Sequence, residues 1–375
     1  MIYLDYSANT PVDARVLEQF CAVERRCIGN ANSHHQAGSA AKAEIDAATI
    51  KIASLLGVQP AEIIYTSGAS EANNFALKGL ARLSRHAGRH IISTPLEHSS
   101  VSGTLTALQE QGYEIDLLDV KQDGTVDLEH LKDLLRPDTI CVAITLVDSE
   151  LGVVQPVQEI AAILKAYPHC HLHVDATQAV GKIPVSFEGV DTMSLTAHKF
   201  YGLNGIGLLI KRRNLALEPL IHGGESTTIY RSGTPTVALA SSLACALDLA
   251  VTDLPGRVDH VAKLNAELRA ALSTYPLVRL NSPDHAIPHV LNLSVRNVKG
   301  TVFQRELDAK GVCVSVKSAC SSDGLPSRAV FAVSRDRRNA LSSWRISLSH
   351  LTTEDEIKAF LQAFDVCYRE LTAVH

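Results

Sequence analysis

His171-Leu-His-Val-Asp175 is the stretch that decides the fold of this chain, together with Ser194-Leu-Thr-Ala-His-Lys199-Phe-Tyr-Gly202, which follows it. Each begins as an apolar run of strand length and ends in polar residues, Asp175 in the first and Thr196 to Lys199 in the second. Residues at the carboxyl ends of parallel strands meet at one edge of a sheet. We therefore expect Asp175 and Lys199 to face the same pocket.

Similar β-rich runs recur along the first two thirds of the chain, and most are separated by amphipathic stretches with helical period. With the two runs above, they predict strands at 62–66, 90–94, 114–118, 140–146, 171–175, 192–195 and 205–210. This alternation predicts an α/β fold with a mostly parallel seven-stranded sheet covered by helices. The active site should lie at the carboxyl ends of these strands.

A second, smaller α+β domain is predicted after Leu254-Pro-Gly, which interrupts the alternating pattern. The pattern beyond it predicts helices at 258–275 and 302–310 and from 353, strands at 290–295 and 344–348, and a Ser/Gly-rich loop at 314–324. We expect a large domain at 12–253 and a small domain formed by 1–11 and 254–375.

Composition narrows the class of protein. The 375 residues are 46% hydrophobic, enough for a substantial core, and the formal net charge of -5 gives no indication of a nucleic-acid or anionic-membrane partner. The N-terminus lacks the apolar stretch of a signal peptide, and the apolar runs are of strand length, so we expect a cytoplasmic protein. The eight cysteines show no Cys-x-x-Cys spacing and should be thiols in a reducing compartment.

The pairing of a lysine with an aspartate indicates a cofactor. A lysine amine can hold pyridoxal phosphate covalently, and a carboxylate can keep the ring nitrogen of that cofactor protonated. The segment Thr66-Ser-Gly-Ala-Ser-Glu71 adds a phosphate site, because it reads as a strand, a small-residue turn and a helix beginning near Glu71. Free backbone N–H groups at Ala69 and Ser70 would meet the anion.

Each of these features also has an ordinary structural interpretation. Asp175 could cap a helix, Lys199 could be solvated surface, and the segment after Thr66 could be a capped helix. A metal site formed by His169, His171 and His173 is a weaker alternative, because alternate residues share a strand face but only Cys170 lies at ligand spacing, on the opposite face. We therefore predict no metal.

The ordered motifs nonetheless add up to a resemblance that covers nearly the whole chain. The sequence resembles the cysteine desulfurases of the aminotransferase class V family, of the long-catalytic-loop type. The motifs that carry this resemblance are Tyr3-Leu-Asp-Tyr-Ser-Ala-Asn-Thr-Pro-Val, Gly29-Asn-Ala-Asn-Ser-His-His, Thr66-Ser-Gly-Ala-Ser-Glu-Ala-Asn-Asn, Leu96-Glu-His, Glu150-Leu-Gly-Val-Val-Gln-Pro, His173-Val-Asp-Ala-Thr-Gln-Ala-Val-Gly-Lys, Ala197-His-Lys, Arg231-Ser-Gly-Thr, Ser318-Ala-Cys-Ser-Ser and Arg345-Ile-Ser-Leu-Ser.

The resemblance implies a fold-type I pyridoxal-phosphate-dependent transferase and a role for each matching residue. Lys199 would hold the cofactor, Asp175 would pair with its ring nitrogen, Gln178 would bond its ring hydroxyl, and His98 would stack on the ring and act in catalysis. The residues that would cradle the phosphate or complete the cofactor site are Ala69, Ser70, Ser149, Thr196, Ala197 and His198. Thr234 would reach the cofactor phosphate of a neighbouring subunit, which implies a homodimer. Arg345 would clamp the α-carboxylate of the substrate, which suits the planar fork of guanidinium.

Cys320 matches the catalytic cysteine of the resembled family, and its Ser-rich surroundings without apolar periodicity predict an exposed thiol. Cys141 and Cys245, in contrast, lie in apolar patterns and should be packing residues. The resemblance then implies that L-cysteine is converted to L-alanine while sulfur passes as a persulfide on Cys320 to an acceptor protein, for iron-sulfur assembly or tRNA thiolation.

Two departures from the resembled family leave alternatives open. Ser149 stands where the family usually has an asparagine, and Gly223-Gly-Glu-Ser-Thr227 replaces its Gly-Gly-Gly-Gln-Glu stretch. A selenocysteine lyase or a class V aminotransferase would keep Lys199 and Asp175 without requiring Cys320. A sulfur-relay scaffold of low activity is the non-enzymatic alternative.

Overall fold

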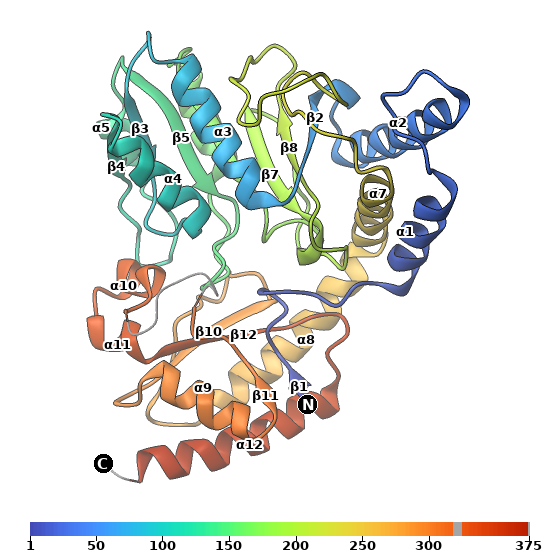
Figure 1. The fold of residues 1–375 in the computed structure, drawn as a ribbon. Helices are drawn as coiled ribbons and strands as arrows, with labels where there is room; N and C mark the ends of the chain where they lie inside the picture. Colours follow the sequence, from blue (N-terminus) through green and yellow to red (C-terminus); the bar gives the residue numbers. More distant parts are fainter. Residues whose placement is uncertain (318–324, 374–375) are drawn as a thin grey trace.

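The computed structural model describes residues 1–317 and 325–373 (Figure 1). A seven-stranded sheet has the order β2-β8-β7-β6-β5-β3-β4, in which only β8 runs antiparallel to its neighbours. Its strands are β2 (Ile63–Thr66), β3 (His90–Ser93), β4 (Glu114–Leu117), β5 (Thr139–Thr145), β6 (His171–Asp175), β7 (Thr192–Thr196) and β8 (Gly207–Lys211). The predicted α/β fold is confirmed, and each strand agrees with the sequence prediction to within two residues.

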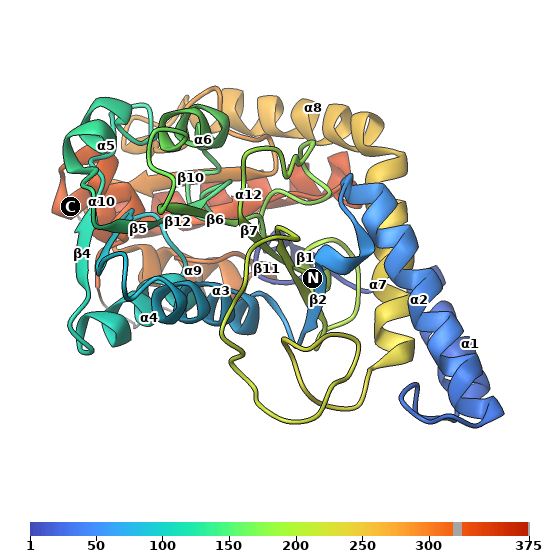
Figure 2. The same cartoon turned by 90° about the horizontal axis from the view of Figure 1, so that it is seen from above.

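Helices cover both faces of this sheet (Figure 2). The helices α3 (Ala69–Leu83) and α4 (Ser99–Gln109) lie on one face. The opposite face and its end are covered by α1 (Ala14–Arg26), α2 (Gln36–Leu56), α5 (Leu128–Leu134), α6 (Val157–Leu164) and α7 (Val237–Thr252).

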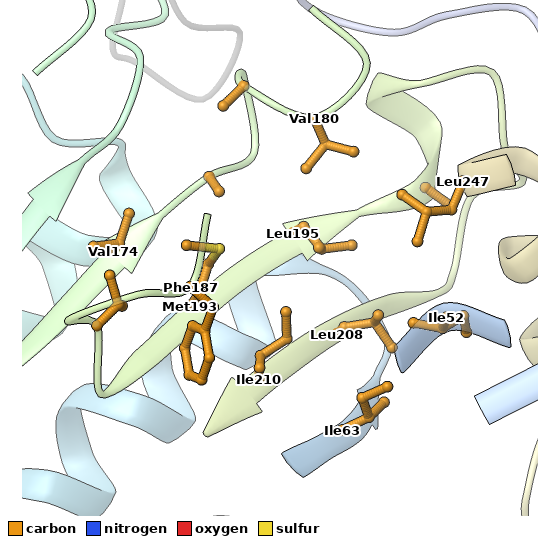
Figure 3. Packing of buried hydrophobic residues seen from close by; sticks show 14 of the residues in the cluster. Ile52, Ile63, Val174, Val180, Phe187, Met193, Leu195, Leu208, Ile210 and Leu247 are labelled. Carbon is orange, nitrogen blue, oxygen red and sulfur yellow. The ribbon is translucent and has the colours of Figure 1, made fainter. Parts of the chain in front are cut away.

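Strand alternation divides the core around this sheet in two. Leu208 and Ile210 of β8 pack into the cluster on the α2 and α7 face, shown in Figure 3, whereas Leu209 between them packs against the α3 face. In β6, Val174 joins the first cluster, so His173 and Asp175 point toward α3. This alternation decides which strand residues can reach the site.

The rest of the chain forms a smaller α+β layer (Figure 1). Its antiparallel sheet has the order β12-β10-β9, and β1 pairs in parallel with β11. The strands are β1 (Ile2–Tyr3), β9 (Val278–Leu280), β10 (Val290–Val295), β11 (Val312–Cys313) and β12 (Ser343–Ser347). The helices are α8 (Leu254–Leu272), α9 (Gly300–Ala309), α10 (Arg328–Ser334), α11 (Arg337–Ser342) and α12 (Glu354–Thr372). Trp344, fully buried, stacks on Phe303 at a ring-centroid distance of 5.2 Å in its core.

The sequence prediction was wrong about the start of α8. Leu254-Pro-Gly was expected to break the pattern before a helix at 258, but α8 begins at Leu254, two residues after α7 ends at Thr252. Pro255 is tolerated there because the first helical turn does not need its missing N–H. Within the described residues, no single helix is long and apolar enough to span a membrane, and α7 with α8 would reach that length only across a 66° bend.

Candidate active site

A cavity of about 350 Å³ opens at the carboxyl ends of the strands, and Arg345 of the smaller α+β layer completes its lining. It brings together residues from segments spread over the whole chain, as expected at the edge of a parallel sheet. The predicted site residues that line it are Ala69, Ser70, His98, Ser149, Asp175, Gln178, Thr196, His198, Lys199 and Arg345.

Asp175 is held at the floor of this cavity by Asn73 of α3. Asn73 Nδ2 donates to Asp175 Oδ2 at 2.8 Å, and the backbone N–H of Thr177 donates to Oδ1 at 2.9 Å. Asn73 Oδ1 in turn accepts from Ser194 Oγ at 2.5 Å and lies 3.0 Å from His173 Nε2. Burial lowers the pKa of His173 to about 4, so its ring is neutral at pH 7. Asp175 therefore has a fixed orientation.

Sequence reasoning missed this role of Asn73. The residue lies in the quoted Glu71-Ala-Asn-Asn stretch, but the sequence alone gave no reason to connect it with Asp175, 102 positions away. The signal that could have found it is its position one helical turn into α3, on the face that turns toward the strand ends.

Lys199 ends the short 3-10 turn Ala197–Lys199 that directly follows β7. Its Nζ donates to the backbone carbonyls of Ser7 at 2.8 Å and Ala8 at 2.6 Å. The N-terminal segment thus passes beside the turn that follows β7 and supplies acceptors to the lysine. Ala197, the first residue of this turn, is in contrast fully buried and does not line the cavity.

The N-terminus of α3 offers an anion site, as predicted, although the helix begins at Ala69 and not near Glu71. Its N-cap Gly68 provides no side-chain acceptor, so the first-turn N–H groups at Ala69 and Ser70 are left for another acceptor. Gly207 of β8 makes room for this turn, because a Cβ on it would lie 2.7 Å from Gly68 Cα.

Two neutral imidazoles face the same cavity. The Thr196 hydroxyl donates to Ile206 O at 3.1 Å, which leaves its oxygen to accept from His198 Nδ1, also at 3.1 Å. Burial, with the charges of Lys199 and Lys182, lowers the pKa of His198 to about 4. His98 caps α4 by accepting the Ser100 N–H at Nδ1, and burial lowers its pKa as well. In its neutral form the proton of His98 is therefore on Nε2.

Arg345 of β12 reaches the cavity from the smaller layer, and both terminal nitrogens of its guanidinium already have hydrogen-bond partners. Its Nη2 lies 2.9 Å from Asp5 Oδ1, and Nη1 donates to the backbone carbonyl of Ser149 at 2.7 Å. Its Nε is buried and has no hydrogen-bond partner among the described residues. Ser149 thus contributes its carbonyl to the arginine, while Asp148 caps the turn by accepting the N–H groups of Glu150 and Leu151.

Three carboxyl groups lie behind the cavity, those of Glu97 and Asp148 buried and that of Glu150 half-buried, and sequence reasoning assigned them no role. Burial, reinforced by Asp175 and Asp148, raises the pKa of Glu97 to about 8. Burial and Glu150 raise the pKa of Asp148 to about 7, and burial raises that of Glu150. Glu150 accepts from Ser327 Oγ at 2.5 Å and so joins this loop to the N-terminus of α10.

Some predicted residues lie elsewhere. Thr234 is exposed on a loop and lines a different cavity, with Ser67 and Arg231. Cys320 lies outside the described residues, whereas Lys317 and Leu325 on either side of it are joined by a hydrogen bond from Lys317 Nζ to Leu325 O at 3.2 Å. Cys141 is buried and Cys245 packs against the core, as expected.

The histidines considered as metal ligands do not converge. His173 lies between Thr192 and Asn73, His171 faces Asp191 at 3.8 Å, and His169 is exposed. Across 1–317 and 325–373, no group of three or more His, Cys, Asp or Glu side chains could hold a metal ion.

Comparison with known proteins agrees with this geometry. The chain matches Aminotransferase class-V over residues 2–360. The chain belongs to this family. It is 40% identical to the cysteine desulfurase IscS of Proteus mirabilis over 95% of this chain and 90% of that protein. Among solved structures, a NifS-like protein superposes with a TM-score of 0.91 at 36% identity over 97% and 98% of the two chains. A structure described as SspA in complex with cysteine has a TM-score of 0.83 at 30% identity over 94% and 100%.

Class-V membership implies pyridoxal phosphate, and the cavity fits it. The side chains that line it supply the kinds of donor and acceptor that this cofactor needs. The cavity also offers a helix N-terminus for a phosphate, a fixed carboxylate for a ring nitrogen and a lysine.

Proposed function

We propose that this chain is a pyridoxal-phosphate-dependent cysteine desulfurase that converts L-cysteine to L-alanine and passes the sulfur, as a persulfide on Cys320, to an acceptor protein. The observation that carries the proposal is the convergence of Asp175, Lys199 and Arg345 in one cavity, because they come from three elements in two layers of the fold. The full-length similarity to cysteine desulfurases supports it.

Each residue of the cavity has a task in this reaction. Pyridoxal phosphate, when bound, supplies an electron sink for the carbon skeleton of the substrate. Lys199 would hold the cofactor and would move a proton at Cα of the substrate. Asp175, fixed by Asn73, would hold the proton of the ring nitrogen, and the neutral ring of His98 would lie against the ring. The first turn of α3 would hold the phosphate, and Thr196 and His198 line the cavity beside it.

Arg345 selects an amino acid by its α-carboxylate. Arg345 lines the cavity, and the fork geometry of its guanidinium suits a planar carboxylate. The 30% identical SspA structure is described as a complex with cysteine, which supports cysteine as the substrate. The carbonyl of Ser149 and the carboxylate of Asp5 hold the guanidinium in place while the substrate binds.

Sulfur transfer requires a second thiol, and we assign it to Cys320. The Cβ–S bond of the substrate breaks, an S–S bond forms with the Cys320 thiolate, and a proton ends on the former Cβ to give alanine. The chain leading to Cys320 starts beside the substrate arginine, because the backbone N–H of Ser315 donates to Arg345 O at 3.2 Å. Ser327, on the other side, is bound to Glu150.

The acceptor and the assembly complete the proposal. The persulfide would pass to a protein of iron-sulfur assembly or of tRNA thiolation in the cytoplasm. Thr234 lies on an exposed loop and does not line the cavity that contains Asp175 and Lys199 of the same subunit. It is therefore available to the cofactor phosphate of a second subunit in a homodimer.

The direct test is incubation of the purified protein with L-cysteine while its visible spectrum, alanine and persulfide are measured. Cys320→Ser should keep the cofactor spectrum and lose sulfur transfer, whereas Cys313→Ser, a free and half-buried thiol of the same layer, should keep both. Full sulfur transfer by Cys320→Ser would contradict the assignment. Retained turnover of selenocysteine by that variant would favour a selenocysteine lyase, and turnover of amino-group acceptors a class V aminotransferase.

A further inference from the structure

Lys182 is a buried lysine beside the cavity that the proposed reaction does not use. It lies just after Gly181, it is 6% exposed, and its Nζ donates to Gln178 Oε1 at 2.6 Å. Within the described residues this is its only side-chain hydrogen bond, and it has no ion pair. A buried ammonium is expensive to desolvate, so a fold keeps one only where its donors have a purpose.

The surroundings of Lys182 exclude the usual purpose of a buried lysine, which is to neutralise a carboxylate. Burial, together with the nearby charges of Lys199 and Arg345, lowers its pKa to about 7. Lys182 also disfavours the charged form of His289, another buried group. The remaining function of its amine is therefore the bond to the Gln178 amide.

That bond, together with the bond from Gln178 Nε2 to Ser7 O, determines which way the amide of Gln178 points. An amide presents an acceptor oxygen at one end and two N–H donors at the other, and either end could in principle face the cavity. Lys182 donates to Oε1, and its amine keeps N–H donors with or without the extra proton, so it favours Oε1 on its own side. Gln178 Nε2 then donates one hydrogen to Ser7 O at 2.9 Å, and its second hydrogen remains for a ligand in the cavity.

We propose that Lys182 is a positioning residue, which holds the Gln178 amide so that its N–H donates to the ring hydroxyl oxygen of the cofactor. This inference rests on the proposed function. It explains why a lysine without a carboxylate partner is buried four residues from Gln178. It also predicts an effect on the cofactor itself, which can be measured without turnover.

The readout is the pH midpoint of the visible band of the lysine-bound cofactor. A hydrogen-bond donor to the ring oxygen stabilises the negative charge on that oxygen. This charge is greatest once the nitrogen that links Lys199 to the cofactor has lost its proton, so the donor favours loss of that proton. Loss of the donor should therefore raise the midpoint. For Lys182→Met we expect a rise of roughly half to one pH unit, the size of one hydrogen bond. Gln178→Ala should show the same rise, and Lys182→Met should add nothing in the Gln178→Ala background.

Two further variants separate positioning from charge and from folding. Lys182→Gln keeps an N–H donor for Oε1 but has no charge, so it should keep the wild-type midpoint. Lys211→Met is the matched control, because Lys211 is also buried but donates to Arg212 O and Leu215 O away from the cavity. It should lower the Tm without moving the midpoint.

Three outcomes would overturn the inference. They are an unchanged midpoint in folded Lys182→Met, an additive shift in the double variant, and a rise in Lys182→Gln as large as that in Gln178→Ala. If Lys182→Met does not fold, Lys182→Leu takes its place, because it also lacks a donor for Oε1 and carries the same expected rise. The other ionisable groups near the two lysines, Asp175, His98, His198, His289 and Arg345, are the same in every variant. Absence of any cofactor band in the wild type would instead refute the proposed function.

Discussion

Arg345 and Asp5 lie 340 positions apart in the chain and are joined by a 2.9 Å contact between Nη2 and Oδ1. Ser315 Oγ donates to the other oxygen of the same carboxylate at 2.9 Å. The arginine is almost fully buried, so the aspartate both neutralises it and fixes the plane of its fork. The extreme N-terminus of the chain thus positions the group that we assign to the substrate carboxylate.

Arg345→Lys is expected to raise the KM for L-cysteine about tenfold or more, because an ammonium cannot form the paired bonds of a guanidinium. Asp5→Ala should raise KM more than Asp5→Asn, which keeps an oxygen for Nη2. Steady-state alanine formation measures both. Arg269→Lys is the control, since Arg269 binds backbone carbonyls of Ser282 and Pro283 away from the cavity. An unchanged KM in Arg345→Lys would refute the substrate role.

Asn73→Ala should weaken both the fold and cofactor retention. Asn73 is fully buried, and its loss removes one hydrogen-bond partner each from Asp175, Ser194 and His173, a cost of roughly 2–4 kcal/mol. Urea unfolding and the rate of cofactor loss on dialysis check this. Asn74→Ala is the neighbouring control, because Asn74 Nδ2 donates to Ser70 O on an exposed part of the helix. Equal effects of the two substitutions would mean that Asn73 does not position Asp175.

Lys199→Ala should abolish covalent attachment of the cofactor. Borohydride reduction followed by mass spectrometry should add the mass of the cofactor to the wild type and to the exposed-lysine control Lys165→Ala, but not to Lys199→Ala. Because Lys199 also donates to Ser7 O and Ala8 O, Tm should fall modestly in the variant. A cofactor adduct on Lys199→Ala would contradict the assignment of this lysine.

Glu97→Gln should change how stability depends on pH. The folded-state pKa of Glu97 is raised to about 8, so its protonated form favours folding below the unfolded pKa near 4.5, and this contribution is lost as the pH rises through about 8. The substituted amide keeps an oxygen for the N–H of Thr145 and the hydroxyl of Thr94, and it cannot ionise. The variant should therefore gain on the order of 3 kcal/mol over wild type between pH 5 and 8.5. Unfolding curves whose difference is the same at the two pH values would exclude this role for Glu97.

The strand ends were predictable from the sequence because strand length and apolar pattern are local. The seven strands and the shared cavity of Asp175 and Lys199 follow from that pattern and from the geometry of a parallel sheet. The start of α8 was predicted less well. A proline can either begin a helix in its first turn or end one. The sequence around Pro255 is compatible with both, and only the position of the preceding helix α7 distinguishes them.

The sequence by itself determined the α/β fold, the cavity edge and the residue types that the chemistry needs. Only the tertiary structure decided how those residues are oriented. Asn73 binds Asp175, the carbonyls of Ser7 and Ala8 bind Lys199, Asp5 binds Arg345, and Lys182 binds Gln178. Most of these partners are distant in sequence, and a hydrogen bond depends on distance and direction, which periodicity does not encode. Even Lys182, only four residues from Gln178, acquires its role through the burial that leaves its amine no other acceptor in the described part of the chain.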